Sequence, residues 1–213
     1  MGNVAGIFLT MQEEMRSLAL FTNQEGMKMT RMVKKKPARK VLKSKISIRR
    51  AKPTKTAKPL GPSVGASAPA FKMPATVVGE VSSAQLKGKP FVLYFYPKDD
   101  TSGCTAEACG FREVVPAFDK LGLTVIGVSK DSITSHEKFA KKHNLNFPLA
   151  SDEAGKVCTR FGVWVKKSMY GRTYMGIERA TFLVDAQGII RHVWRKVSVP
   201  GHVDAVKETI KEL

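Results

Sequence analysis

An apolar run that leads into a helix beginning beside a cysteine constrains this chain more than any other feature. Residues 91–96 (FVLYFY) are apolar without interruption, Pro97 ends the run, and Cys104 follows a short polar loop. A continuous apolar run predicts a central strand that is buried on both faces. The free N–H groups and the positive dipole end of a helix's first turn favour a thiolate. The order of strand, loop and thiol therefore predicts a reactive cysteine at Cys104.

The segment after the loop has the apolar spacing of a helix. Because apolar side chains recur at steps of four and three, one stripe of the helix should be buried, with the Cys104 thiol facing a semi-apolar pocket. Pro116 lacks an N–H group, so we expect a kink or break near residues 112–115 and a short helix. The stripe consists of Cys104, Ala108, Phe111, Val115 and Phe118.

The rest of the domain alternates strands with helices, which indicates an α/β fold. We expect a leading hairpin from residues 74–78 and 80–83, and a second hairpin from residues 180–185 and 189–194. Ser132 and Ser151 are predicted N-caps, and Gly162 a helix end. The other expected elements are strands 124–129 and 147–150, a helix over 132–143, a short helix ending at Gly162, and a last helix after Pro200 with Val203, Val206, Ile210 and Leu213 on one face.

The first 60 residues carry most of the positive charge. They hold 15 Lys and Arg against 3 Asp and Glu, whereas residues 61–213 hold 21 against 15. A segment so rich in charge and poor in large apolar side chains cannot bury enough surface to offset its ordering entropy. We therefore predict a basic, largely disordered extension over residues 1–62 and one folded domain over residues 63–213. A basic tail can in general attract nucleic acid or an anionic membrane. For this extension the alternatives are a solvated linker and a weak contact with nucleic acid.

Residues 1–22 do not match a membrane or secretory segment. The apolar stretch VAGIFLTM is too short to span a bilayer, and it lacks the basic start and cleavage site of a secretory signal. Gly6 stands where a myristoylation motif needs Ser or Thr. An organelle transit peptide and a translation start downstream of Met1 both stay open. We expect that the protein does not associate with a membrane. We expect a cytoplasmic location, or a nuclear or plastid location if the extension is a targeting segment.

The cysteine pattern indicates a reducing compartment rather than a disulfide-stapled secreted domain. The chain has three cysteines. Four residues separate Cys104 from Cys109, and there is no second pair and no finger-like histidine spacing. We therefore expect no metal site. Cys158 is interpreted as a buried spectator, and Trp164 and Trp194 as packing residues.

Pro97, Thr101 and Cys104 match the P-x-x-x-T-x-x-C signature of peroxiredoxins. With YFYPKDDT, GCTAEA and Cys109, residues 64–213 resemble the peroxiredoxin Q, or bacterioferritin comigratory protein, branch of that family. The resemblance implies a thioredoxin-like fold with peroxiredoxin-type insertions, in which a central mixed sheet is flanked by helices. Ser102 stands where the family usually has proline; serine is a good N-cap, so we expect the helix start to be preserved.

The resemblance also implies the site and its partners. Cys104 would be the peroxidatic cysteine and Cys109 the resolving one. Arg179 would activate the thiolate and polarise the peroxide, with Thr101 presenting its hydroxyl and Pro97 shaping the loop. We expect a monomer without haem, flavin or metal that reduces hydrogen peroxide and organic hydroperoxides and is recycled by thioredoxin or a similar dithiol.

Two other functions stay open at this point. The first is a redox-switched, nucleic-acid-associated protein that binds through the basic extension, with the cysteine pair as the switch. The second is a plain disulfide oxidoreductase, although the chain has no C-x-x-C pair. Basic and aromatic residues alternate over residues 166–174, as on some nucleic-acid-binding surfaces, and we interpret this stretch as a solvated loop.

Overall fold

The computed structural model describes residues 61–169 and 171–212, so the prediction for residues 1–60 lies outside the described residues. Within the described part, no helix is long and apolar enough to cross a membrane. The strands are β1 (Lys72–Ala75), β2 (Gly79–Ser82), β3 (Phe91–Phe95), β4 (Thr124–Ser129), β5 (Leu149–Ser151), β6 (Trp164–Met169), β7 (Arg172–Ile177), β8 (Ala180–Val184) and β9 (Ile190–Trp194). The helices are α1 (Ser102–Asp119), α2 (Ile133–His143), α3 (Lys156–Arg160) and α4 (His202–Ile210).

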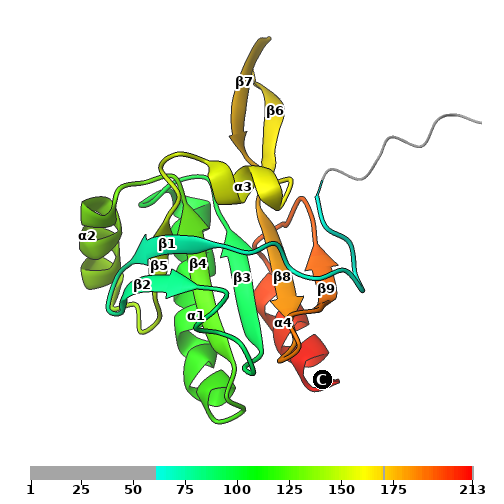
Figure 1. The fold of residues 1–213 in the computed structure, drawn as a ribbon. Helices are drawn as coiled ribbons and strands as arrows, with labels where there is room; N and C mark the ends of the chain where they lie inside the picture. The colour runs from blue at the N-terminus through cyan, green and yellow to red at the C-terminus, as the bar shows by residue number, and fades with distance from the viewer. Residues whose placement is uncertain (1–60, 170, 213) are drawn as a thin grey trace, which may run out of the picture. The chain divides into compact units, whose positions relative to one another are not determined.

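A seven-stranded mixed sheet organises the domain, in the order β2-β1-β5-β4-β3-β8-β9 (Figure 1). β3 pairs in parallel with β4 and antiparallel with β8, which makes it the central strand that the apolar run predicts. Both predicted hairpins are present, as β1 with β2 and as β8 with β9. The α/β class and the mixed sheet flanked by helices are confirmed.

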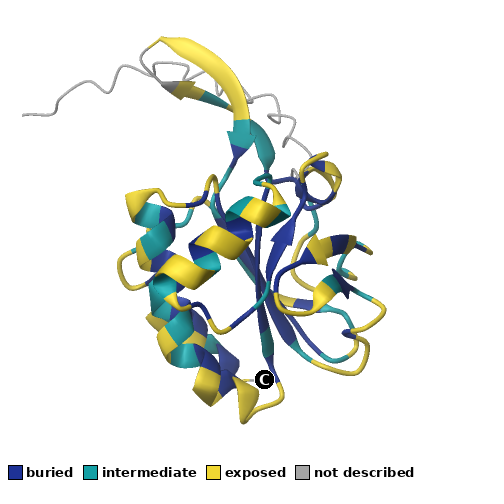
Figure 2. Cartoon of the chain, turned by 90° about the vertical axis from the view of Figure 1, so that its left-hand side faces the viewer, coloured by how far each residue is buried: buried dark blue, intermediate teal, exposed yellow. Residues whose placement is uncertain are grey.

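The side chains of β3 divide between two cores, one on each face of the sheet. Phe91, Leu93 and Phe95 belong to a cluster that includes residues of α3. Val92 and Tyr94 belong to a second cluster, built with residues of α1, α2 and α4. Figure 2 shows the buried residues in the strands and on the inner sides of the helices. Because both faces are covered, every residue of β3 is buried, as a continuous apolar run requires.

Helix α1 buries the predicted stripe but is longer than predicted. All five stripe residues from Cys104 to Phe118 are buried. The expected break before Pro116 is wrong, because α1 continues through Pro116 to Asp119. Proline removes the N–H group that would reach the carbonyl of Arg112, four residues earlier. Asn146 supplies a replacement, since its Nδ2 donates to the Arg112 carbonyl over 3.2 Å.

Two of the predicted N-caps differ from the structure, while the third is confirmed. Ser132 caps α2, and its side chain accepts a hydrogen bond from the Ser135 N–H. Ser151 lies in β5 instead, and Gly155 occupies the N-cap position of α3 with a φ of 68°. The N-cap of α1 is Thr101, so Ser102 is the first helical residue rather than the cap.

Residues 166–174 were expected to form a solvated loop, and this is wrong. They lie in an antiparallel ribbon of β6 and β7 that projects from the domain (Figure 1). Most of the described residues from 166 to 175 are exposed on both faces of the ribbon. A ribbon without a buried face has no apolar alternation, which explains why the sequence pattern suggested a loop. Tyr170, at the turn, lies outside the described residues.

Candidate active site

Cys104 lies in the first turn of α1, just beyond the carboxyl end of β3. Its side chain is 1% exposed and packs in the cluster that contains Ala108 and Phe111. The thiol is free. Thr101 caps the helix only by its backbone position, since its side chain makes no capping hydrogen bond. The first-turn N–H groups therefore receive no acceptor from that side chain, which leaves the positive end of the helix beside the sulfur.

Arg179 reaches this sulfur from the start of β8. Because Ala180 pairs with Phe95, the residue before β8 lies next to the end of β3. The Arg179 Nη2 donates to Cys104 Sγ over 3.3 Å. A side chain at Gly103 would crowd this contact, since a Cβ there would lie 3.3 Å from Nη2. The geometry places a permanent cation against the thiol.

Glu107 is a part of the site that the sequence analysis missed. Its carboxylate is fully buried and forms an ion pair with the Nη1 of Arg179. Burial raises the pKa of Glu107 to about 7, while the charge and hydrogen bond of Arg179 act in the opposite direction. The signal was present in the sequence, because Glu107 follows Cys104 by three residues and so lies on the buried stripe. Buried carboxylates are rarely found unpaired, so an acid at this position pointed to a cation nearby.

Arg179 pairs with Glu107 and Cys104, and its neighbour Glu178 has a different partner. Glu178 accepts a hydrogen bond from Arg195 Nε over 2.6 Å. Burial lowers the pKa of Arg179, but the charges of Glu107 and Cys104 outweigh this and raise it above its ordinary value. The guanidinium therefore stays charged while it lies between two acidic groups.

Thr101 and Pro97 lie on the exposed side of the same loop. The Thr101 hydroxyl donates to the carbonyl of Lys98 over 3.1 Å, which fixes its direction. Pro97 is exposed and follows the last buried residue of the β3 run, Tyr96. Pro97 therefore lies where the strand run ends and the loop begins.

Cys109 shares α1 with Cys104. It is partly exposed and its thiol is free. Five residues along a regular helix correspond to a Cα separation of about 8 to 9 Å, and the side chains point in different directions. Bridged cysteines seldom exceed about 7 Å. The two thiols therefore cannot form a disulfide while α1 is intact between them.

The third cysteine differs from the other two in its surroundings. Cys158 is fully buried in α3, and its own N–H donates to Asp152 Oδ2 over 2.7 Å. Burial, together with the charge of Asp152, raises the pKa of Cys158 far above its ordinary value. The thiol is therefore neutral, as a buried spectator would be.

The two tryptophans pack against the cores. Trp164 lies against the cluster that contains α3, with Lys130 Nζ 4.7 Å from the centre of its ring. Trp194 packs against the cluster that contains α1, and its ring centroid lies 4.0 Å from that of His192. Among the described residues, no group of three His, Cys, Asp or Glu side chains could hold a metal ion.

Comparisons with known proteins agree with this geometry. Residues 64–193 match the AhpC/TSA family. A putative peroxiredoxin bcp of Coxiella burnetii is 52% identical over 143 residues, which cover 67% of this chain and 95% of that protein. The solved structure of a Xylella fastidiosa PrxQ variant has a TM-score of 0.67 at 35% identity, and the match covers 70% of this chain and 96% of that one. A Xanthomonas campestris bacterioferritin comigratory protein, studied for alkyl peroxide reduction, has a TM-score of 0.64 at 41% identity, over 67% of this chain and 90% of that one.

A thioredoxin-like fold with a buried thiol at a helix start and an arginine against it defines the peroxiredoxin class. The chain belongs to the AhpC/TSA family, and within it to the Bcp or peroxiredoxin Q branch. It is therefore a thiol peroxidase of the oxidoreductase class. The predicted family and fold are confirmed.

Proposed function

We propose that Cys104 is the peroxidatic cysteine, and the contact of Arg179 Nη2 with Cys104 Sγ at 3.3 Å is the observation that carries this assignment. The helix end and the guanidinium both stabilise a thiolate. The thiolate attacks one peroxide oxygen, the O–O bond breaks, and the departing oxygen takes a proton to leave as water or an alcohol. The products are that molecule and the sulfenic acid of Cys104.

Arg179 and Thr101 have complementary roles in this step. The guanidinium faces the sulfur and can stabilise the negative charge that develops on the peroxide oxygens. The hydroxyl hydrogen of Thr101 is used in the bond to Lys98, so its oxygen offers lone pairs to the hydrogen of a peroxide. Pro97 sets the direction of the loop that carries Thr101 and does not take part in the chemistry.

Cys109 resolves the oxidised cysteine. Its thiolate attacks the sulfur of the Cys104 sulfenic acid, which releases water and leaves a disulfide between the two cysteines. Because both residues lie in α1, the helix must unwind locally before this step. Unwinding also exposes the disulfide to an external dithiol, which takes both oxidising equivalents by thiol–disulfide exchange. Thioredoxin, or a similar dithiol protein, fits this role.

The substrates are hydrogen peroxide and organic hydroperoxides. The alkyl peroxide activity for which the Xanthomonas campestris relative was studied supports the organic class. The expected monomer and cytoplasmic location stay predictions. Nucleic-acid contact would need the basic residues 1–60, which lie outside the described residues. It stays a prediction that a salt-dependent binding assay on the full chain can test.

The decisive test is peroxide consumption coupled to thioredoxin and thioredoxin reductase. The full chain should turn over, the Cys104→Ser variant should be inactive, and Cys158→Ser should keep most of the activity because its thiol is buried away from the site. Equal losses in both variants would remove the assignment of Cys158 as a spectator. Full activity in Cys104→Ser would overturn the proposed mechanism.

A further inference from the structure

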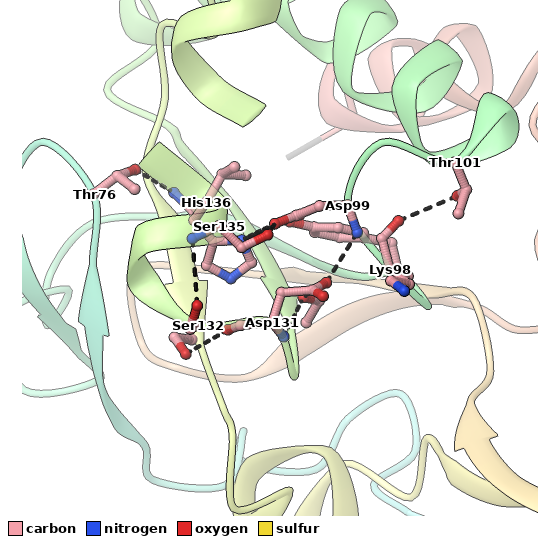
Figure 3. A network of polar contacts seen from close by, with 12 residues as sticks. Thr76, Lys98, Asp99, Thr101, Asp131, Ser132, Ser135 and His136 are labelled. Atoms are coloured by element: carbon pink, nitrogen blue, oxygen red, sulfur yellow. Dashed lines mark hydrogen bonds and ion pairs between the residues drawn. The ribbon is translucent and has the colours of Figure 1, made fainter. Parts of the chain in front are cut away.

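The loop that precedes α1 is hydrogen-bonded to α2 through a buried carboxylate. Asp99 is 6% exposed and lies five residues before Cys104. Its Oδ1 accepts a hydrogen bond from Tyr96 Oη over 2.8 Å. Its Oδ2 accepts from Ser135 Oγ over 2.7 Å and from His136 Nδ1 over 2.9 Å (Figure 3). The carboxylate thus has three donors, two of which come from the first turn of α2.

The protonation of this pair follows from its contacts. Burial raises the pKa of Asp99, but the hydrogen bonds from His136, Ser135 and Tyr96 and the charge of His136 outweigh it, so the pKa lies below its ordinary value. The carboxylate is therefore ionised, and the hydrogen it shares with the ring belongs to His136 Nδ1.

The surroundings of Nε2, the other ring nitrogen of His136, show which part of the side chain interacts with the protein. The side chain is fully buried, and its Nε2 has no hydrogen-bond partner among the described residues. An unpaired buried nitrogen is costly, and an apolar side chain could fill this place without that cost. The contribution of His136 is therefore its Nδ1–H, which is directed at the loop.

The backbone of the loop is held as well. The Asp99 N–H donates to Asp131 Oδ2 over 2.9 Å (Figure 3). The same oxygen accepts from Ser129 Oγ at the end of β4. The next residue, Asp100, has a φ of 55° in the left-handed region, and its side chain accepts from Lys142 and His143 at the far end of α2. Two successive loop residues are thus tied to opposite ends of one helix.

Thr101 depends on this arrangement. Its hydroxyl donates to the carbonyl of Lys98, the residue immediately before the anchored Asp99 (Figure 3). A shift of the loop would turn this carbonyl, and with it the oxygen that Thr101 presents. Cys104 and its contact with Arg179 are held separately, by the buried stripe of α1 and by β8.

We propose that Asp99 and His136 are positioning residues that hold the Thr101 loop in the geometry needed for peroxide to react with Cys104. The inference rests on the proposed function of Cys104. Neither residue touches the reacting atoms. Their loss should slow the attack on peroxide more than any reaction that needs only the thiolate.

The test compares two substitutions of His136 with a control on the same helix. His136→Leu removes the donor, whereas His136→Asn keeps an N–H group near the place of Nδ1. Ala140→Gly is the control, because Ala140 lies in α2, packs partly buried against the second cluster, and has no polar side chain to contact the loop. Glycine lowers helix stability at such a position, so the change loosens α2 without removing a donor. For each variant we would measure the rate constant for hydrogen peroxide under single-turnover conditions, the alkylation rate of Cys104 with iodoacetamide, and the melting temperature.

Misplacement of catalytic groups by about 1 Å can cost roughly 100-fold, so His136→Leu should lower the peroxide rate by roughly 10- to 100-fold. Alkylation of Cys104 should change little, and His136→Asn should recover much of the peroxide rate. Ala140→Gly should keep the peroxide rate even if it lowers the melting temperature. An unchanged peroxide rate in folded His136→Leu, an equal loss in Ala140→Gly, or no recovery in His136→Asn would overturn the proposal.

Ser135→Ala covers the case in which His136→Leu does not fold. This change removes one of the three donors to Asp99, so the peroxide rate should fall by less than in His136→Leu but measurably. An unchanged peroxide rate in Ser135→Ala would contradict the positioning role of Asp99. If the unaltered protein does not consume peroxide, the proposed function is wrong. If it does, and the variants react with peroxide at the same rate, only the positioning role of Asp99 and His136 is wrong.

Discussion

Asn146 Nδ2 donates to the carbonyl oxygen of Arg112 over 3.2 Å and so occupies the place of the N–H group that Pro116 lacks. The Arg112 side chain makes a second link to the same segment, since its Nη1 donates to the carbonyl of His143 over 2.8 Å. Helix α1 is therefore fastened at Arg112 to the segment at the end of α2. Unwinding that starts around Cys104 should end there.

Asn146→Ala should loosen the part of α1 after Arg112. The Arg112 carbonyl would lose its donor, and because the bond is exposed the free energy of unfolding should fall by about 1 kcal/mol or less. Amide hydrogen exchange over residues 113–119 should rise in the reduced protein. Urea unfolding and exchange measurements would check both effects; unaltered exchange in this segment would show that the bond does not hold the helix.

Arg179→Ala should slow the reaction with peroxide. The change removes the donor to Cys104 Sγ and leaves Glu107 without its cation, so the second-order rate constant should fall by roughly 100- to 1,000-fold. The thiolate absorbance at neutral pH should fall with it. Arg191→Ala is the matched control, because Arg191 pairs with Asp185 at an exposed position. A normal rate and absorbance in Arg179→Ala would remove Arg179 from the site.

Glu107→Gln should change how stability depends on pH. The pKa of Glu107 is raised from 4.5 to about 7 by burial, so the folded protein binds a proton that the unfolded chain releases between these values. Its contribution to stability is full below pH 4.5 and is lost as the pH rises through 7. Urea unfolding of both proteins at several pH values should show this loss in the unaltered protein and not in the variant. Parallel curves would contradict it.

The central strand and the buried face of α1 could be predicted from local sequence patterns. The contacts that hold α1 past Pro116 and pair Glu107 could not, because their partners are distant in the sequence. Residues 91–96 predicted the central strand, and the stripe from Cys104 to Phe118 predicted the buried face of α1. The continuation of α1 past Pro116 depends on Asn146, 30 residues away in sequence, which no local pattern reveals. The ion pair of Glu107 likewise joins α1 to the start of β8, 72 residues away.

A chain that begins at Gly61 should fold and turn over peroxide normally. The site residues between Pro97 and Arg179 all lie downstream, and residues 1–60 are too polar to contribute to a core. Coupled peroxide consumption and thermal unfolding would compare this chain with the full one. An insoluble or inactive product would show that the basic extension packs on the domain and that the predicted boundary is wrong.

The most direct test of the central claim follows the protein through one oxidation. Reduced protein would be treated with one equivalent of hydrogen peroxide, then analysed by hydrogen exchange and by mass spectrometry after cleavage at Glu107, which separates Cys104 from Cys109. The account predicts a Cys104–Cys109 disulfide as the main product, with exchange over residues 104–111 sharply higher than in the reduced protein. A Cys104–Cys158 bridge as the main product, or equal protection of this segment in both states, would contradict it.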